Sequence, residues 1–94
     1  MNNSINFDSL EWSTLGWEYS QPDASGCWRL TKRNDDDEEI VYYGQLDRGI
    51  PNGLGSLKVG NRYIHRGQWY DGECIEEYDA KEYDNEMNRI QNRK

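Results

Sequence analysis

The chain has 94 residues, and its 18 acidic side chains outnumber its 11 basic ones, which gives a formal net charge of −7. This charge argues against direct binding to nucleic-acid phosphates or to anionic membrane surfaces, which both attract basic proteins. No apolar run approaches the roughly 18 residues of a membrane helix, and the N-terminus lacks a signal-peptide pattern. We therefore expect one cytoplasmic domain over residues 1–94, with a core supplied largely by four Trp, seven Tyr and one Phe.

The first 20 residues place apolar side chains at nearly alternate positions, which favours a strand. Asp8 and Glu11 could instead frame a short helical turn, so strand and helix both stay open here. We expect residues 1–25 to hold an N-terminal strand or cap and a degenerate repeat. The apolar positions are Ile5, Phe7, Leu10, Trp12, Leu15, Trp17 and Tyr19.

Residues 21–45 predict a hairpin, because two strand-like segments, Cys27 to Lys32 and Ile40 to Gln45, flank a polar connection. The connection, Asn34 to Glu39, ends in five consecutive acids. A calcium loop of the EF-hand type needs oxygen ligands at alternate positions, a central Gly and a distal Glu, and this spacing is absent. We expect a solvated hairpin tip.

A tighter hairpin is predicted at Gly60-Asn61, a two-residue connection between Leu57 to Val59 and Arg62 to Gly67. In the simplest register, Leu57 pairs with Ile64 across the two strands.

After residue 74 the apolar side chains recur at three- or four-residue steps, which predicts an acidic helix over residues 75–94. Tyr83, Met87 and Ile90 form its apolar face, which would pack on the sheet or on a partner. Arg89, Arg93 and Lys94 lie near its end, where the helix dipole favours cations.

Glycine and apolar residues recur at an interval of 23 in the middle of the chain: Gly44 with Gly67, Gly49 with Gly72, and Leu46 with Trp69. A second comparison, at an offset of 29, aligns Trp17 with Leu46, Pro22 with Pro51, Gly26 with Gly55, and Trp28 with Leu57. A hairpin of this length cannot bury its own apolar face and must stack on its neighbours. The predicted fold is therefore mainly β, with tandem antiparallel hairpins over residues 26–73 and a C-terminal α-helix.

Residues 42–73 carry about one and a half copies of a glycine-aromatic motif. The first copy begins Tyr42-x-Gly44, passes through Leu46 and Gly49, and reaches Asn52-Gly53-x-Gly55; the next opens His65-x-Gly67-x-Trp69 and ends Gly72-Glu73. This motif resembles the MORN (membrane occupation and recognition nexus) repeat family. The family usually has Trp at the position of Leu46 and Tyr at that of His65.

The resemblance implies a scaffold or adaptor that binds another protein through an exposed aromatic groove, where Tyr and Trp are favoured as anchors. The residues that we expect in this contact are Tyr42, Leu46, Tyr63, His65, Trp69 and Tyr70. Lipid binding, which the family name suggests, is a lesser alternative because of the net charge. Open sheet edges leave a homodimer as a further alternative.

No residues with a recognisable catalytic spacing occur, so we expect neither an enzyme nor a cofactor. The single histidine, His65, has no nucleophile arranged beside it in a known motif. It cannot make a metal site alone, and Cys27 or Cys74 would have to meet it through the fold. We therefore expect no metal site and two reduced cysteines.

Negative charge is concentrated in residues 71–86, where eight acids accompany the single Lys81. This pattern supports an alternative function, a small acidic inhibitor or immunity protein of the anti-defence or anti-CRISPR type. Such a protein would block a basic nucleic-acid-binding site on another protein through Glu76, Glu77 and Asp79. Alternatively, the acids only keep the chain soluble.

Overall fold

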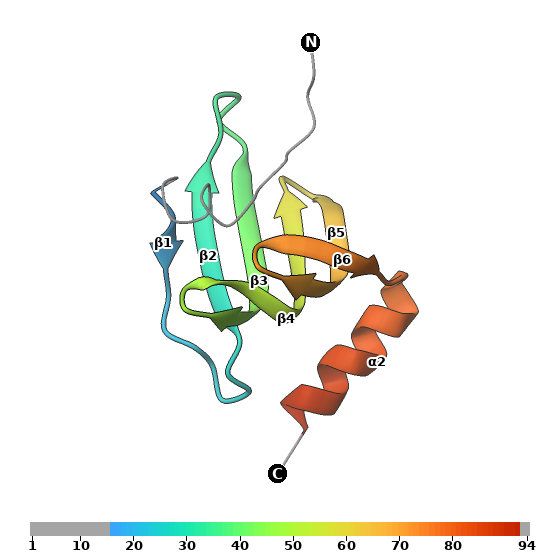
Figure 1. Cartoon of the computed structure of the whole chain (residues 1–94). Helices are drawn as coiled ribbons and strands as arrows, with labels where there is room; N and C mark the ends of the chain where they lie inside the picture. Colours follow the sequence, from blue (N-terminus) through green and yellow to red (C-terminus); the bar gives the residue numbers. More distant parts are fainter. Residues whose placement is uncertain (1–15, 93–94) are drawn as a thin grey trace.

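The structure is a computed structural model that describes residues 16–92. Within this range six strands form one antiparallel sheet in chain order, and a helix follows the last strand (Figure 1). This confirms the predicted mainly β fold of successive hairpins with a C-terminal helix. The expected strand or helical turn before residue 16 lies outside the described residues. The elements are β1 (Glu18–Tyr19), β2 (Trp28–Arg33), β3 (Glu39–Asp47), β4 (Ile50–Val59), β5 (Arg62–Tyr70), β6 (Glu73–Glu77) and α2 (Ala80–Gln91).

The 23-residue interval is present in the strands themselves, since β5 begins and ends 23 residues after β3 does. The turns that follow these strands also match. Arg48 and Gly49 have φ angles of 57° and 81°, and Asp71 and Gly72 have 53° and 86°. Two successive positive φ angles are typical of type I′ turns, whose twist suits a tight hairpin. The glycine at the second position therefore recurs because the turn recurs.

The offset of 29 between the first hairpin and the later ones is wrong. Leu30 of β2 pairs with Tyr42, and Leu57 of β4 pairs with His65. Because Tyr42 and His65 occupy equivalent positions 23 residues apart, β2 corresponds to β4 at an offset of 27. Leu30, and not Trp28, is thus the counterpart of Leu57.

The hairpin between β4 and β5 turns at Gly60-Asn61 as predicted, but its register differs from the simplest one. Val59 pairs with Arg62 and Lys58 with Tyr63, whereas Leu57 pairs with His65 instead of Ile64. Ile64 is therefore an extra residue in β5, a β-bulge. A bulge shifts the alternation of side chains, so that Tyr63 and His65 lie on opposite faces of the sheet.

The predicted helix over residues 75–94 begins too early, because residues 73–77 form β6. The helix starts at Ala80, after Asp79, whose side chain accepts a hydrogen bond from the Glu82 backbone N–H at 2.8 Å. The Glu82 carboxylate in turn accepts one from the Asp79 N–H, which completes a capping box. A strand that pairs with β5 overrides the weak helical spacing around Ile75.

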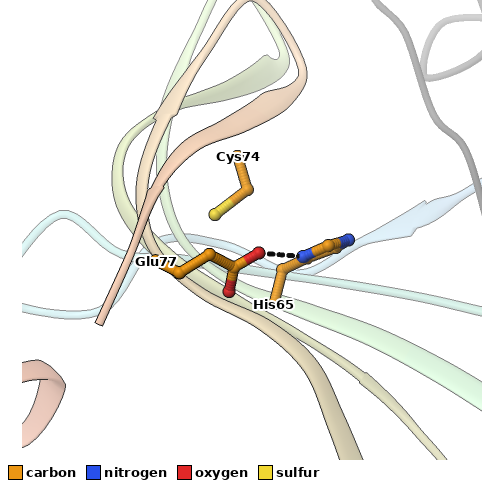
Figure 2. Close-up of side chains that lie close together, drawn as sticks. All are labelled: His65, Cys74 and Glu77. Atoms are coloured by element: carbon orange, nitrogen blue, oxygen red, sulfur yellow. Dashed lines mark hydrogen bonds and ion pairs between the residues drawn. The ribbon is translucent and has the colours of Figure 1, made fainter. Parts of the chain in front are cut away.

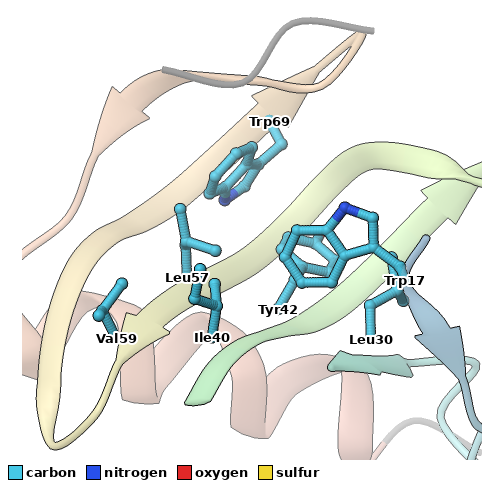
Figure 3. Packing of buried hydrophobic residues seen from close by; sticks show 7 residues of the cluster. All are labelled: Trp17, Leu30, Ile40, Tyr42, Leu57, Val59 and Trp69. Carbon is cyan, nitrogen blue, oxygen red and sulfur yellow. The ribbon is translucent and has the colours of Figure 1, made fainter. Parts of the chain in front are cut away.

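The two faces of the sheet carry separate apolar clusters. On one face, Tyr42 and Trp69 meet edge to face with ring centroids 5.3 Å apart, and the Trp69 indole N–H donates to the Gly55 carbonyl at 2.9 Å. Figure 3 shows this cluster, which comprises Trp17, Leu30, Ile40, Tyr42, Leu57, Val59 and Trp69. On the other face, Tyr83 and Met87 of α2 pack with Cys27 and Leu54, and Ile90 lies against them. The predicted apolar face of the helix is therefore confirmed.

Candidate functional site

Two of the expected contact residues lie in the interior of the domain. Tyr42 is fully buried and Trp69 is 3% exposed, and both belong to the core cluster of Figure 3. Leu46 is half-buried and packs against the same cluster. The exposed aromatic groove expected from these residues is therefore wrong, because strand alternation directs them into the core.

Tyr63 is half exposed, but it lies on the helix-covered face of the sheet, away from Trp69. Its ring contacts two cations, with Lys58 Nζ at 5.4 Å and the Arg66 guanidinium at 4.6 Å from the ring centroid. Tyr63 also lines a groove of about 290 Å³ together with Arg29, Lys58 and Tyr83. Glu39 lines the groove as well, so that its lining carries both basic and acidic side chains.

A buried phenol, that of Tyr83, is part of the lining of this groove. The Tyr83 side chain is 7% exposed, and its hydroxyl is buried. Burial raises the pKa of Tyr83 to about 12, and the nearby Ser56 hydroxyl opposes this shift. Tyr83 is therefore neutral at physiological pH and contributes packing to this face.

The remaining predicted residues gather at the hairpin of β5 and β6. Tyr70 is 64% exposed at the end of β5, and Glu76 is exposed on β6. Ile75, which sequence reasoning placed in the helix, is 65% exposed on the same strand. Among the described strands, β6 pairs only with β5 and is therefore an edge of the sheet that these residues form. We call the surface formed by Tyr70, Glu73, Ile75 and Glu76 the β6 edge.

His65, Cys74 and Glu77 converge beside this edge, on the face of the sheet that carries the Trp69 cluster (Figure 2). His65 Nδ1 lies 2.5 Å from Glu77 Oε2, and the ligand atoms of all three side chains lie within 4.8 Å of one another. The His65 ring also meets the Trp69 indole edge to face, with centroids 6.1 Å apart. All three residues are partly accessible, since His65 and Cys74 are half-buried and Glu77 is exposed.

A second β-bulge creates this cluster. Gln68 pairs with Glu76 and Trp69 pairs with Cys74, so that Ile75 is an extra residue in β6. Residues three apart in a regular strand point to opposite faces, but the bulge places Cys74 and Glu77 on the same face. His65 joins them because it lies four residues, two full alternations, before Trp69. Sequence spacing alone gives no signal of such a bulge.

The two cysteines lie in different surroundings. Cys27 is 1% exposed in the cluster under α2, where its thiol is 3.9 Å from Met87 Sδ. Cys74 is half-buried, and burial, followed by the negative charge of Glu77, raises its pKa to about 11. The fold therefore brings Cys74, and not Cys27, to His65. We had expected no metal site, and the sequence did not predict that these residues would meet.

Asp79 has a structural role that the sequence-based assignment missed. Its carboxylate caps α2, as described above, while the acids that precede it on β6 are exposed without such a role. A contact between Asp79 and a partner stays a prediction. A change at Asp79 would alter the helix as well as the surface charge.

Comparisons of the chain with protein-family models, with curated proteins and with solved structures found no match. No helix in the described range is long and apolar enough to cross a membrane.

Proposed function

We propose that this protein is a non-catalytic protein-interaction module of the cytoplasm, and that its main contact surface is the β6 edge. The observation that carries the proposal is that β6 is an edge strand among the described residues and exposes Ile75, next to the exposed Tyr70 at the end of β5. Open strands bind extended segments of other proteins through backbone hydrogen bonds, and neighbouring side chains provide specificity. The MORN-like motif of residues 42–73 agrees with an adaptor or scaffold role.

The charge of the β6 edge indicates the chemistry of the partner. Glu73 and Glu76 flank the exposed apolar side chain, and Glu77 follows them. Acidic residues on an edge strand discourage pairing between copies of the same chain, because like charges meet. The same residues favour a strand or loop rich in Lys and Arg. We therefore expect a basic partner rather than a homodimer through this edge.

The test is affinity capture from the native cell with mass spectrometry, followed by binding measurements on the captured protein. Ile75→Asp should reduce its affinity at least tenfold while the circular dichroism spectrum stays native. Glu76→Lys should also weaken binding, whereas Asp35→Lys, the same charge change at the distant β2–β3 tip, should not. Equal effects of Glu76→Lys and Asp35→Lys, or none from Ile75→Asp, would refute the proposal.

A second function, the acidic inhibitor, is favoured by the clustering of charge. The eight acids of residues 71–86 lie on one continuous segment, from the β5–β6 turn through β6 into the first turns of α2. An inhibitor of this type would occupy the basic groove of a nucleic-acid-binding protein. Its binding should weaken steeply with salt and be reversed by added DNA or RNA, whereas an adaptor complex resists the nucleic acid.

A further inference from the structure

We propose that His65, Cys74 and Glu77 bind one divalent transition-metal ion, of which Zn²⁺ is the best fit, and leave a fourth position to water or an added ligand. The inference rests on the convergence of three different ligand types on adjacent strands (Figure 2). It does not depend on the proposed protein-binding function.

The donor set selects the class of metal. Imidazole nitrogen, thiolate sulfur and carboxylate oxygen are the three ligand types that Zn²⁺ takes in proteins, whereas Ca²⁺ and Mg²⁺ prefer oxygen alone. Tetrahedral coordination with ligand bonds of about 2.0–2.3 Å places ligand atoms roughly 3.3–3.8 Å apart. The observed atoms lie within 4.8 Å of one another, with the His65–Glu77 pair at 2.5 Å. These extremes lie about 1 Å outside the tetrahedral range, so the side chains would rotate on binding the ion.

The placement of Cys74 separates this cluster from an ordinary surface ion pair. A hydrogen bond between His65 and Glu77 needs only those two residues, yet the bulge at Ile75 also directs the Cys74 thiol to the same point. Bulges are frequent beside functional sites, where they re-aim a side chain. The Trp69 ring packs edge to face against His65 and restricts the orientation of the imidazole.

Coordination would join β5 to β6 at two points on β6. Cys74 pairs with Trp69 near the start of β6, and Glu77 pairs with Gly67 at its end. A metal that binds only the folded arrangement stabilises it. The ion should therefore raise the midpoint of thermal unfolding and slow amide exchange along β6.

The experiment uses the full, tag-free chain, kept reduced and stripped with a chelator. Co²⁺ serves as the optical probe, because a thiolate ligand gives a charge-transfer band in the near ultraviolet. We expect a saturable 1:1 titration with this band, reversed by Zn²⁺. Cys27→Ala, which removes the other thiol, should retain the band, and Cys74→Ser should lose it. Glu77→Gln should weaken Co²⁺ binding at least tenfold.

A second readout covers variants that fail to fold. In the unmodified chain, Zn²⁺ should slow alkylation of Cys74 by iodoacetamide under native conditions, as mapped by mass spectrometry. Absence of saturable Co²⁺ binding, a charge-transfer band that survives Cys74→Ser, or alkylation of Cys74 at the same rate with and without Zn²⁺ would each overturn the proposal.

Discussion

Replacing Trp69 tests whether this residue stabilises the core or contacts a partner. Its side chain is 3% exposed, meets Tyr42 edge to face at 5.3 Å and donates a hydrogen bond to the Gly55 carbonyl. Trp69→Ala removes the ring and the donor together, whereas Trp69→Phe keeps an aromatic ring and loses the N–H donor. Comparing the two variants shows how much of the stability the remaining aromatic ring preserves.

The magnitudes follow from these contacts. Trp→Ala in a core costs about 3–5 kcal/mol, and loss of the bond to Gly55 adds about 1 kcal/mol. A domain of this size is stable by about 5–14 kcal/mol. Trp69→Ala therefore removes a large part of the free energy of unfolding. Trp69→Phe should cost about 1–2 kcal/mol, since it loses the hydrogen bond and part of the buried area.

Urea unfolding followed by far-ultraviolet circular dichroism measures both changes. With a slope near 1 kcal/mol per M, of the order seen for small proteins, Trp69→Ala should lower the midpoint by about 4–6 M or unfold the chain. Trp69→Phe should lower it by about 1–2 M. A midpoint for Trp69→Ala within about 1 M of the unmodified protein, at the same slope, would show that the ring is not part of the core.

Three further changes test other parts of the structure. Gly67→Ala should destabilise β6 by about 1–3 kcal/mol, because the added Cβ would overlap the Glu76 carbonyl oxygen. Amide exchange over residues 73–77 should become faster, and unchanged exchange would contradict this prediction. Asp79→Ala should lower the free energy of unfolding by about 1 kcal/mol, because α2 loses its cap. Asp79→Ser keeps a capping side chain and should retain most of the stability in thermal unfolding. Equal stability of both variants and the unmodified protein would exclude a capping role. Hydrogen bonds, first from the Ser25 hydroxyl and then from the Tyr43 hydroxyl, lower the pKa of Asp23 from 3.8 to about 2. Because this folded-state pKa lies below the unfolded value, the stabilisation is complete above about pH 4 and is lost as the pH falls toward 2. An NMR titration of the Asp23 carboxyl with a midpoint near 3.8 would contradict this.

The repeat could be found in the sequence because the turns require particular residues. Gly49 and Gly72 follow a residue with positive φ in the same turn type, so the interval of 23 marks real hairpins. The first hairpin has no such pair of turns to align, since its connection is the longer acidic tip. The offset of 29 therefore matched residue types without matching positions in the sheet.

Side-chain direction was harder to predict, because it depends on bulges. The extra residues Ile64 and Ile75 leave the hydrophobic pattern almost unchanged, yet each shifts the alternation of its strand. The first bulge places Tyr63 apart from His65. The second places Cys74 beside Glu77. The residues predicted to form one aromatic surface therefore lie apart. Tyr42 and Trp69 are in the core, whereas Tyr63 lies on the helix-covered face of the sheet.

The end of the sheet was missed for a similar reason. Ile75 fits the three- and four-residue spacing of the helix that follows, and nothing in this short acidic stretch favours a strand strongly. Pairing with β5 decides its conformation, and this tertiary contact is not visible in the local pattern. The apolar face of the helix, by contrast, could be predicted from its spacing, although the capping role of Asp79 was not.

Hydrogen–deuterium exchange of the chain bound to its captured partner tests the central proposal most directly. If the partner docks on the β6 edge, the amides of Glu73–Glu77 should exchange more slowly in the complex, while those of the β2–β3 tip keep their rates. Protection confined to the tip or to the groove beside Tyr63, with unchanged exchange along β6, would contradict the account.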